Sequence, residues 1–240
     1  MWTVSSNPVL NHFLTDKLLT LGADIVGFAD LEPAPEPLRR GYPRAVSFGL
    51  AIEPAVVAGI EDGPTAEYRA VYESFNAKLT AMSRETAAAG VAQGWRAEAR
   101  PGSGDMDWTT LLAPFSHKMA ATLAGLGWIG KCDLLVTPAF GSAIRWATVL
   151  TDAPLDCGVP VTESRCGDCR ACVDVCPGHA CSGKLWRQGM AREEFWNPQA
   201  CMAGMREINA RQGTDLKICG MCIAVCPYTK STNRQKRRGA

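Results

Sequence analysis

The chain has 240 residues, of which 47% are hydrophobic, so it is long enough for one substantial core and a smaller satellite domain. Its 25 basic and 24 acidic residues leave a net charge of +1, which argues against a general binder of nucleic acids. The first residues do not resemble a secretory signal, and no stretch approaches the roughly 18 apolar residues of a membrane helix. We therefore expect a cytoplasmic protein without a membrane partner, whose eleven cysteines are metal ligands or inert core thiols.

The N-terminal part of the chain predicts a helix followed by two buried strands. Asn7-Pro8 is typical of a helix N-cap with proline at the first helical position. Gly22 ends the run of apolar residues at helical spacing that follows, which comprises Val9, Leu10, Phe13, Leu14, Leu18 and Leu21. The apolar segments 24–30 and 44–52, separated by a proline-rich loop, predict the two strands.

A long helix and a shorter one are predicted next. The long helix is expected to begin at Pro64 and to end before Gly90, with an apolar stripe formed by Tyr68, Val71, Tyr72, Phe75, Leu79 and Met82. The segment 101–108 predicts a glycine-rich loop. Ser116 is a candidate N-cap for a helix over 117–127, whose residues expected to face the core are Met119, Ala120, Leu123 and Ala124.

Two further strands, 132–138 and 143–151, are predicted on either side of the turn AFGS. The chain then changes character, with most of its cysteines and little periodicity. We therefore predict an α+β domain over residues 1–155, which holds a cofactor and substrate, and a small cysteine-rich domain over residues 156–230. The end of the chain, 231–240, predicts a basic, solvated and disordered tail, and docking to a nucleic acid or an acidic redox partner is the alternative.

The cysteines of the C-terminal part occur in two runs. The first run, CGDCRACVDVCP, spaces its cysteines by two, two and three residues and comprises Cys166, Cys169, Cys172 and Cys176. This spacing is typical of the bacterial ferredoxin run that binds a cubane iron–sulfur cluster. The second run, CGMCIAVCP, supplies Cys219, Cys222 and Cys226, and Cys201 is the available fourth donor. Structural zinc is the alternative, but it usually takes two C-x2-C pairs separated by a longer loop.

Two [4Fe-4S] clusters are therefore predicted, in a domain similar to bacterial ferredoxins. In two-cluster proteins the fourth cysteine of such a run ligates the other cluster. We expect one cluster on Cys166, Cys169, Cys172 and Cys226, and the other on Cys176, Cys201, Cys219 and Cys222. Clusters of this kind transfer single electrons at low potential, and the long N-terminal part predicts that an acceptor is held there. This favours an enzyme over a simple electron carrier.

The segment AGLGWIGK (124–131), the segments LLVTPAFGS and VLTDAPL and the two cysteine runs together resemble epoxyqueuosine reductases and their relatives, the reductive dehalogenases. The likeness extends from about residue 21 to residue 231. It implies an N-terminal domain similar to flavin nitroreductases and cobalamin-processing proteins, which holds a corrinoid (cobalamin) beside the nearer cluster. The residues that the resemblance implies in cofactor binding are Lys118, Gly127, Trp128, Gly130, Lys131, Cys132, Gly141 and Ser142.

The sequence departs from this family at several positions. The aspartate that donates a proton in epoxyqueuosine reductases corresponds to a position near Leu111, and the nearest acids are Asp105 and Asp107. A Glu-Arg pair of the family is replaced by His117 and Lys118, and the helical-repeat region that grips tRNA in full-length members is not found. We take His117 and Asp107 as candidate proton donors, although His117 could also be a locally hydrogen-bonded residue at a helix start. The expected substrate is a small organic molecule other than epoxyqueuosine.

The cluster and corrinoid interpretations leave three functional hypotheses. The first is a corrinoid-dependent reductase that takes electrons from a low-potential donor, such as a ferredoxin or flavodoxin, through the two clusters. The second is a redox partner that reduces a corrinoid protein or another acceptor. The third keeps the enzyme and replaces cobalamin with a flavin.

Three cysteines remain outside the predicted ligand sets: Cys132, Cys157 and Cys181. Cysteine is often a small buried apolar residue, and this is the interpretation for each of them. Cys132 is the one to test, because it directly follows GWIGK and stands where the family carries an asparagine.

Overall fold

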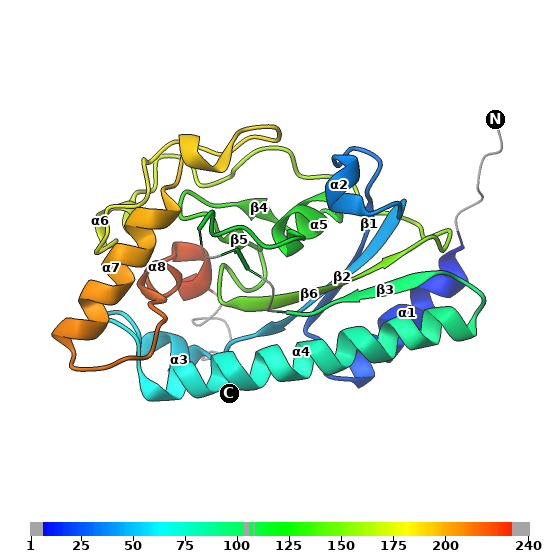
Figure 1. Cartoon of the computed structure of the whole chain (residues 1–240), viewed down its shortest axis with the longest axis horizontal. Coiled ribbons are helices and arrows are strands. Elements are labelled where there is room, and N and C mark those ends of the chain that lie inside the picture. Colours follow the sequence, from blue (N-terminus) through cyan, green and yellow to red (C-terminus); the bar gives the residue numbers. More distant parts are fainter. Residues whose placement is uncertain (1–6, 103–105, 108, 232–240) are drawn as a thin grey trace. The chain divides into compact units, whose positions relative to one another are not determined.

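The computed structural model describes residues 7–102, 106–107 and 109–231 (Figure 1). The chain forms two compact units. The first comprises Met1–Leu50, Ser74–Leu126 and Arg145–Val161, and the second comprises Ala51–Glu73, Gly127–Ile144 and Thr162–Ala240. Two segments from the range predicted as the first domain, Ala51–Glu73 and Gly127–Ile144, belong to the second unit with the cysteine-rich part. Most of the predicted tail, together with Asp105 and Trp108, lies outside the described residues.

A four-stranded sheet forms the centre of the first unit, with the strand order β1-β2-β6-β3. Strand β1 (Ile25–Asp30) pairs antiparallel with β2 (Arg44–Ala51), and β3 (Ala97–Arg100) pairs antiparallel with β6 (Ile144–Thr151). The strands predicted over 24–30, 44–52 and 143–151 are thereby confirmed. Strand β3 was not predicted, because its sequence AEAR carries almost no apolar signal, and it is defined by its pairing with β6.

Helix α1 (Pro8–Thr20) begins as predicted, with the side chain of Asn7 accepting the backbone N–H of Leu10. Its buried face consists of Leu10, Leu14 and Leu18. The predicted face was too wide, however, since Val9 is 79% exposed and Phe13 is 41% exposed. The apolar residues of the sequence pattern therefore include two that the helix presents to solvent.

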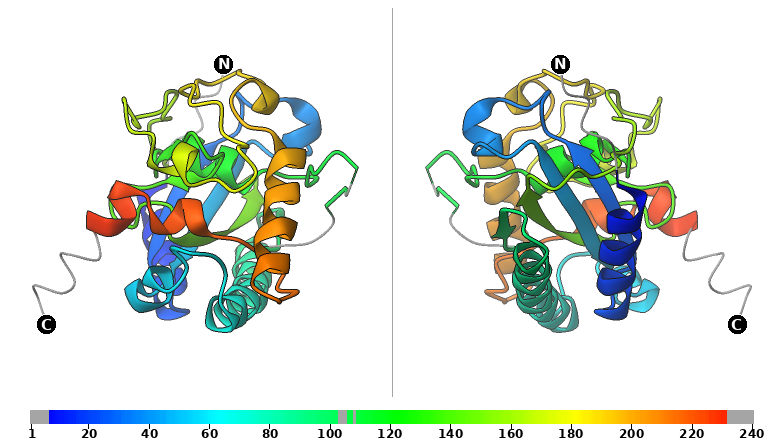
Figure 2. Two further views of the ribbon diagram at one scale, coloured as in Figure 1. Left: turned by 90° about the vertical axis from the view of Figure 1, so that its left-hand side faces the viewer. Right: turned by 90° about the vertical axis from the view of Figure 1, so that its right-hand side faces the viewer.

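Helices cover both faces of this sheet, as the side views in Figure 2 show. On β2, Val46 and Phe48 pack in one apolar cluster with α1 and with α4 (Ala66–Ala92). Ala45, which points to the opposite face, packs in a second cluster with α5 (His117–Leu123). This alternation is the two-residue period of a strand, and both sides of it are apolar because both faces are covered.

Helices α4 and α5 are both present where they were predicted, but α5 ends at Leu123 and not at residue 127. Ser116 caps α5 by accepting the backbone N–H of Met119. Helix α4 begins at Ala66 and continues through Gly90 to Ala92, so glycine does not end it where the sequence pattern predicted. A glycine inside a helix costs only about 1 kcal/mol relative to alanine.

The second unit is built mainly from loops and short elements. Strands β4 (Trp128–Ile129) and β5 (Leu135–Val136) form a small antiparallel ladder. The strand predicted over 132–138 is thus reduced to β5, and its partner is β4 rather than β6. The helices of the cysteine-rich part are α6 (Ala171–Asp174), α7 (Pro198–Arg211) and α8 (Met221–Ala224). The remaining short helices of the chain are α2 (Glu36–Arg39), α3 (Pro54–Ala58) and the 3-10 turn η1 (Arg192–Glu194).

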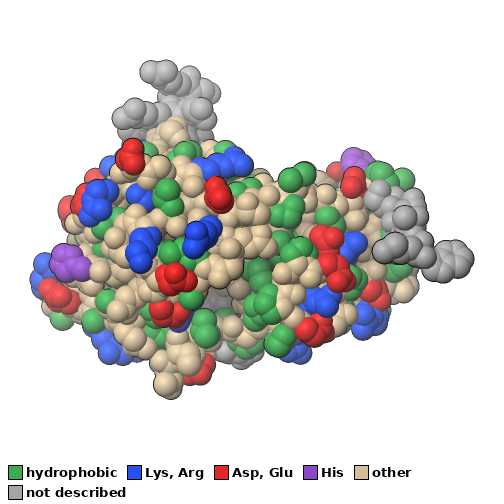
Figure 3. Space-filling view, turned by 90° about the horizontal axis from the view of Figure 1, so that it is seen from above, with side chains coloured by type: hydrophobic (Ala, Val, Ile, Leu, Met, Phe, Trp, Pro, Cys, Tyr) green, Lys and Arg blue, Asp and Glu red, His purple; other side chains and the backbone are tan. Residues whose placement is uncertain are grey.

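Acidic and basic side chains are interspersed on the face of the molecule seen in Figure 3, with hydrophobic ones between them. This distribution agrees with the nearly balanced charge of the sequence. Among the residues described, none of the helices combines the length and the apolar character needed to cross a membrane.

Candidate metal centre

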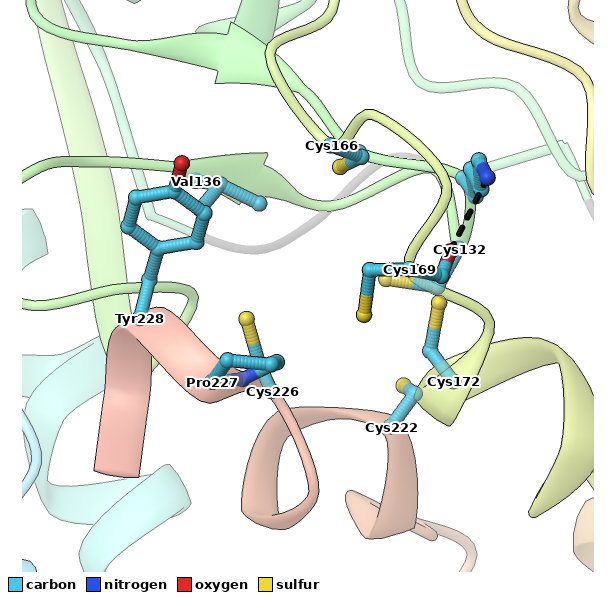
Figure 4. A pocket seen from close by; sticks show the side chains of 11 residues that line it. Cys132, Val136, Cys166, Cys169, Cys172, Cys222, Cys226, Pro227 and Tyr228 are labelled. Carbon is cyan, nitrogen blue, oxygen red and sulfur yellow. Dashed lines mark hydrogen bonds between the residues drawn. The ribbon is translucent and has the colours of Figure 1, made fainter. Parts of the chain in front are cut away.

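A cavity of about 310 Å³ in the second unit is surrounded by thiols (Figure 4). It is lined by all four cysteines predicted to hold the first cluster, which are Cys166, Cys169, Cys172 and Cys226, and also by Cys222, which the sequence assigned to the second cluster. Cys166 and Cys169 lie in the loop that precedes α6, Cys172 lies within α6, and Cys226 follows the end of α8. Segments more than fifty residues apart in the sequence therefore meet at this cavity, and the division of the cysteines between two clusters stays a prediction.

Lys131 and Trp128 hold the loop that carries the first three thiols. The buried ammonium group of Lys131 donates hydrogen bonds to the carbonyl oxygens of Gly167, at 2.8 Å, and of Cys169, at 2.9 Å. The indole N–H of Trp128 lies 3.4 Å from the sulfur of Cys166, and its ring meets Tyr228 edge-on at 4.9 Å. N–H groups directed at cluster sulfurs favour the thiolate form and influence the reduction potential.

We expect that replacing Lys131 with methionine weakens this loop. Methionine keeps the apolar stem of the side chain but removes both hydrogen bonds from the loop carbonyls, with an expected loss of about 1–3 kcal/mol in unfolding free energy. Urea titration followed by the visible absorbance of the clusters measures the effect. Lys184→Met, at an exposed lysine of the same unit, is the control. Identical urea midpoints for Lys131→Met and the unaltered protein would contradict the role of Lys131.

The second predicted donor set also gathers in space. Burial and the neighbouring Cys222 and Cys176 thiols raise the pKa of Cys201 to about 12. Burial and the same two thiols raise the pKa of Cys219 to about 11. These four residues are the ones that the sequence assigned to the second cluster. Repulsion between thiolates disfavours ionisation until a cation compensates their charge, and a bound metal deprotonates coordinating thiols outright.

Helix α7 brings Cys201 to this set through a contact between two glycines. A β-carbon on Gly204 of α7 would overlap the backbone nitrogen of Gly178, and one on Gly178 would overlap the carbonyl oxygen of Ala200. Gly178 follows the ligand Cys176 by two residues. The absence of both side chains therefore allows the helix to approach the first cysteine run closely enough to place Cys201 beside Cys176.

The start of α7 carried a signal that the sequence analysis did not use. Asn197 accepts the backbone N–H of Ala200, and Pro198 occupies the first helical position. This is the same Asn-Pro pattern that correctly predicted α1. The pattern locates Cys201 in the first turn of a helix.

The donor chemistry of both sets fits iron–sulfur clusters. Within the described part of the chain, no three His, Cys, Asp or Glu side chains are arranged to hold a single metal ion. In a cubane, by contrast, each thiolate binds a different iron atom, so four thiolates surround a larger group. Eight thiols, seven from the two runs and one from Cys201, are the number expected for two such clusters.

Several residues implied in corrinoid binding have other roles in the second unit. Lys131 and Trp128 hold the cluster loop, as described above. Gly127 approaches β5 so closely that a β-carbon would overlap the carbonyl oxygen of Val136. The residue-level prediction of the corrinoid site is therefore not supported at these three positions, since their side chains or close contacts already serve the fold.

The same holds for the residues after β5. Gly130 donates its N–H to the carbonyl oxygen of Leu134 at 2.8 Å, which closes the β4–β5 turn. A β-carbon on Gly141 would overlap Thr229, whose hydroxyl oxygen accepts the N–H of Ser142 at 3.1 Å. The AFGS turn thus packs against Thr229, in the segment that follows Cys226. Lys118, the second residue of α5, belongs to the first unit.

His117 is hydrogen-bonded within the first unit, to residues that are 16 and 31 positions away in the sequence. Its Nε2 lies 2.9 Å from the carbonyl oxygen of Pro101, and its Nδ1 lies 2.9 Å from the hydroxyl of Thr148. Because a carbonyl only accepts, Nε2 carries the proton and Nδ1 accepts the hydroxyl hydrogen. Burial lowers the pKa of His117 to about 4. The imidazole of His117 is therefore neutral, and both of its nitrogens already take part in hydrogen bonds. This arrangement does not favour a role as proton donor.

We expect His117 to make the stability of the protein depend on pH. Its folded-state pKa, about 4, lies below the ordinary value of 6.5, so protonation favours the unfolded chain. The contribution is complete above pH 6.5 and is lost as the pH falls toward 4, by about 3 kcal/mol in total. Urea unfolding followed by circular dichroism measures the unfolding free energy as a function of pH. Its decrease between pH 6.5 and pH 4 should be smaller in His117→Gln and should be retained in His12→Gln, a change at an exposed histidine. Equal slopes in the two variants would contradict the assignment.

Asp107, the other candidate proton donor, is exposed in the loop before α5. Its carboxylate accepts the backbone N–H groups of Thr109 and Thr110, which lowers the pKa of Asp107. These hydrogen bonds stabilise the ionised form, whereas a proton donor needs the protonated form at working pH. In this arrangement Asp107 is a turn-forming residue.

Two of the leftover cysteines lie among the ligands, which the sequence did not reveal. Cys132 interacts with the thiols of Cys172 and Cys222, and Cys181 interacts with Cys172 and Cys176. Hydrogen bonding to Cys172 is the main cause that raises the pKa of Cys132 and that of Cys181. Both are buried, as predicted, in an apolar cluster that contains Val173, Leu134 and Trp196 as well as ligand cysteines.

Comparison with known proteins supports the cluster assignment. Residues 165–229 match the 4Fe-4S double cluster binding domain. The epoxyqueuosine reductase of Synechococcus sp. (strain CC9605) is 34% identical over 139 residues, which cover 56% of this chain and 41% of the relative. That of Bacillus subtilis (strain 168) is 31% identical over 123 residues, covering 48% and 29%. The matched region thus spans less than half the length of these relatives.

Two solved structures share the fold. The catabolic reductive dehalogenase NpRdhA in complex with 3-bromo-4-hydroxybenzoic acid has a TM-score of 0.69 at 19% identity, covering 98% of this chain and 34% of that one. An epoxyqueuosine reductase with an epoxyqueuosine-modified tRNA-Tyr stem loop has a TM-score of 0.61 at 21% identity, covering 96% and 67%. The predicted α+β fold followed by a double-cluster domain is confirmed.

The double-cluster domain over residues 165–229 marks this chain as an iron–sulfur protein. Over the matched region the chain is similar to epoxyqueuosine reductases, and its fold is shared with solved epoxyqueuosine reductases and reductive dehalogenases.

Proposed function

We propose that this protein is an iron–sulfur reductase that passes low-potential electrons, one at a time, to an acceptor used for the reduction of a small organic substrate. The observation that carries the proposal is the gathering of the predicted ligand cysteines in the second unit, where Cys166, Cys169, Cys172, Cys222 and Cys226 line the 310 Å³ cavity. Bound there, [4Fe-4S] clusters supply one-electron chemistry at low potential.

The chain's own residues prepare this site for electron entry. Cys169 is exposed, unlike the other seven predicted ligands, so a donor protein can approach the first donor set at this residue. Lys131 places a positive charge behind the same loop through its bonds to Gly167 and Cys169. This charge stabilises the additional electron of a reduced site. A small ferredoxin or flavodoxin is the proposed donor.

Cobalamin is the acceptor that we propose first. The support comes from relatives, among them a reductive dehalogenase structure described as suggesting a mechanism for B12-dependent dehalogenation, with a TM-score of 0.55. The residues implied in corrinoid binding do not fit that role in the described structure, because most of them serve the β4–β5 turn, the cluster loop or the AFGS turn. We therefore assign no step of the reaction to a corrinoid and treat its binding as a question for experiment.

A redox-partner function is the second candidate, and the same observation favours it. Lys131, Trp128 and Gly127 make contacts within the second unit. An acceptor that is supplied by another protein does not need a corrinoid pocket made from these residues. The protein would then reduce a corrinoid protein or another external acceptor.

The test is anaerobic purification, an iron count and a visible spectrum recorded with added cobalamin. We expect about eight irons per chain, four for each cubane. A shifted spectrum of tightly bound cobalamin supports the enzyme. Reduction of free cobalamin without binding supports the redox partner, and a yellow bound chromophore supports a flavin. Substantially fewer irons, with zinc in their place, would overturn the proposal.

Epoxyqueuosine is not the proposed substrate. Leu111 stands near the position of the family's proton donor, His117 is neutral and internally bonded, and Asp107 is held as a carboxylate. An RNA stem loop carrying epoxyqueuosine, incubated with the reduced protein and cobalamin, is therefore expected to remain unchanged. Formation of queuosine would contradict this part of the proposal.

A further inference from the structure

A buried tryptophan side chain donates a hydrogen bond to a predicted cluster ligand. Trp128 is 2% exposed, and its indole nitrogen lies 3.4 Å from the sulfur of Cys166. A tryptophan N–H usually finds a hydrogen-bond partner when it is buried. Among the described residues, the sulfur of Cys166 is the acceptor that this N–H meets. The fold thus directs a side-chain N–H at the first cysteine of the first run.

The β4–β5 ladder holds the backbone of Trp128. Trp128 pairs with Val136 of β5. The preceding residue, Gly127, packs so closely against β5 that a β-carbon would overlap the carbonyl oxygen of Val136. The ladder therefore sets the point from which the indole ring reaches Cys166.

Residues next to both cysteine runs hold the indole ring itself. The Cζ atom of Arg165, the residue before Cys166, lies over the ring at 5.8 Å from its centre. The ring of Tyr228, which follows Cys226 by two residues, meets the indole edge-on, with 4.9 Å between the ring centres. The hydroxyl of Tyr228 donates to the carbonyl oxygen of Arg165 at 3.3 Å. These contacts restrict the ring and, with it, the direction of the N–H.

An iron-bound thiolate is a better acceptor for this N–H than a neutral thiol. The sulfur of a thiol accepts weakly, whereas hydrogen bonds to an ionised acceptor are roughly twice as strong as those between neutral groups. Hydrogen bonds to the sulfurs are also one of the factors that set the reduction potential of an iron–sulfur cluster. A reduced cluster carries one more negative charge than an oxidised one, so the donor stabilises the reduced form more. The N–H therefore raises the potential, and its removal lowers it.

We propose that the indole N–H of Trp128 raises the reduction potential of the cluster that Cys166 ligates and thereby favours electron transfer from the donor protein onto this cluster. Trp128 acts through Cys166 and is a positioning residue. The exposed Cys169 belongs to the same predicted ligand set, so the cluster influenced by Trp128 is the one that a donor approaches. The step moves one electron, which oxidises the donor protein and reduces the cluster. The inference rests on the proposed function, because it requires an iron–sulfur cluster at Cys166.

Trp128→Phe tests the proposal, because phenylalanine keeps an aromatic ring but has no N–H. Redox titration of the anaerobic holoprotein, monitored by electron paramagnetic resonance, measures the potential of each cluster. The signal that is lost in Cys226→Ser identifies the cluster of Cys166. In Trp128→Phe the equilibrium constant for reduction of this cluster should fall by up to about tenfold, which is a shift of about 59 mV to a more negative potential. The iron content should stay at about eight atoms per chain.

The second cluster and a second tryptophan provide the controls. The sulfur of Cys176, a predicted ligand of the second cluster, accepts the backbone N–H of Ala180 at 3.3 Å, and no change at Trp128 removes this bond. The potential of the second cluster should therefore be the same in Trp128→Phe. Trp196 pairs with Cys181 in a β-bridge of the same unit, but its indole N–H donates to no sulfur among the described residues. Trp196→Phe should leave both potentials unchanged.

A second measurement on the unaltered protein applies even where Trp128→Phe fails to fold. When the protein is produced with tryptophan carrying ¹⁵N at the indole nitrogen, pulsed electron paramagnetic resonance should detect ¹⁵N coupled to the reduced cluster of Cys166. The same coupling should persist in Trp196→Phe.

An unchanged or more positive potential in folded Trp128→Phe would overturn the proposal. Absence of the ¹⁵N coupling in the unaltered protein would overturn it as well. Too few irons in the unaltered protein would instead overturn the proposed function on which it rests.

Discussion

Replacing Cys226 with serine is expected to remove one iron–sulfur cluster and leave the other. Cys226 lines the cavity of the first donor set together with Cys166, Cys169 and Cys172. Burial, with a smaller contribution from the Cys166 thiol, raises the pKa of Cys226. The iron content should therefore fall from about eight to about four atoms per chain. The remaining electron paramagnetic resonance signal should be that of a single isolated cluster, without the broadening produced by two neighbouring spins.

Cys157→Ser is the matched control, because it changes a thiol of the first unit that is outside both ligand sets. It should retain all the iron. If Cys226→Ser loses both clusters while circular dichroism shows the fold intact, the division of ligands between the two sets is wrong. Retention of all iron would show that another cysteine replaces Cys226, and Cys132, which lines the same cavity, is the nearest alternative.

Replacing Gly204 with alanine is expected to destabilise the second cluster, for which Cys201 is a predicted ligand. The new β-carbon would overlap the backbone nitrogen of Gly178, and backbone atoms cannot move aside as a flexible side chain can. We expect α7 to be displaced, which withdraws Cys201 from Cys176, Cys219 and Cys222. Forced overpacking of this kind costs about 1–3 kcal/mol in unfolding free energy. The second cluster should be lost or become labile, whereas the cluster missing from Cys226→Ser should remain.

Gly90→Ala is the control, because it makes the same glycine-to-alanine change within a helix but without a clash with the backbone. Gly90 lies within α4, and a β-carbon there would meet only the β-carbon of Ala97, at an ordinary 3.4 Å. This variant should keep all its iron and gain up to about 1 kcal/mol in stability from the better helix former. A Gly204→Ala protein with the iron content and stability of Gly90→Ala would disprove the close contact between α7 and the first cysteine run.

The pair of variants also tests the interleaving of the two cysteine runs. Cys226 belongs to the second run in the sequence but lines the cavity of the first donor set. Cys176 belongs to the first run but lies with Cys201 and Cys219. Selective loss of different clusters in Cys226→Ser and Gly204→Ala is the result expected from this exchange. Loss of the same cluster in both would contradict it.

The local signals of the sequence predicted the helices and strands with strong patterns. Asn7-Pro8 and Ser116 marked true helix starts, because a side-chain oxygen that accepts an orphan N–H works without help from the rest of the fold. The prediction missed β3, and it stopped α4 too early at Gly90. In both cases, packing against the rest of the first unit outweighed a local preference.

The cysteine spacing determined the metal chemistry by itself, because three thiols separated by two residues can reach one cluster only from a single tight loop. The sequence also carried the resemblance to epoxyqueuosine reductases, through the segments around AGLGWIGK. The roles of the other site residues depended on contacts between distant segments, which no local pattern encodes. Only the tertiary structure showed that Lys131 bonds the cluster loop and that His117 is internally satisfied. It alone placed Cys132 and Cys181 against Cys172, because residues forty and nine positions away meet there only after the chain has folded.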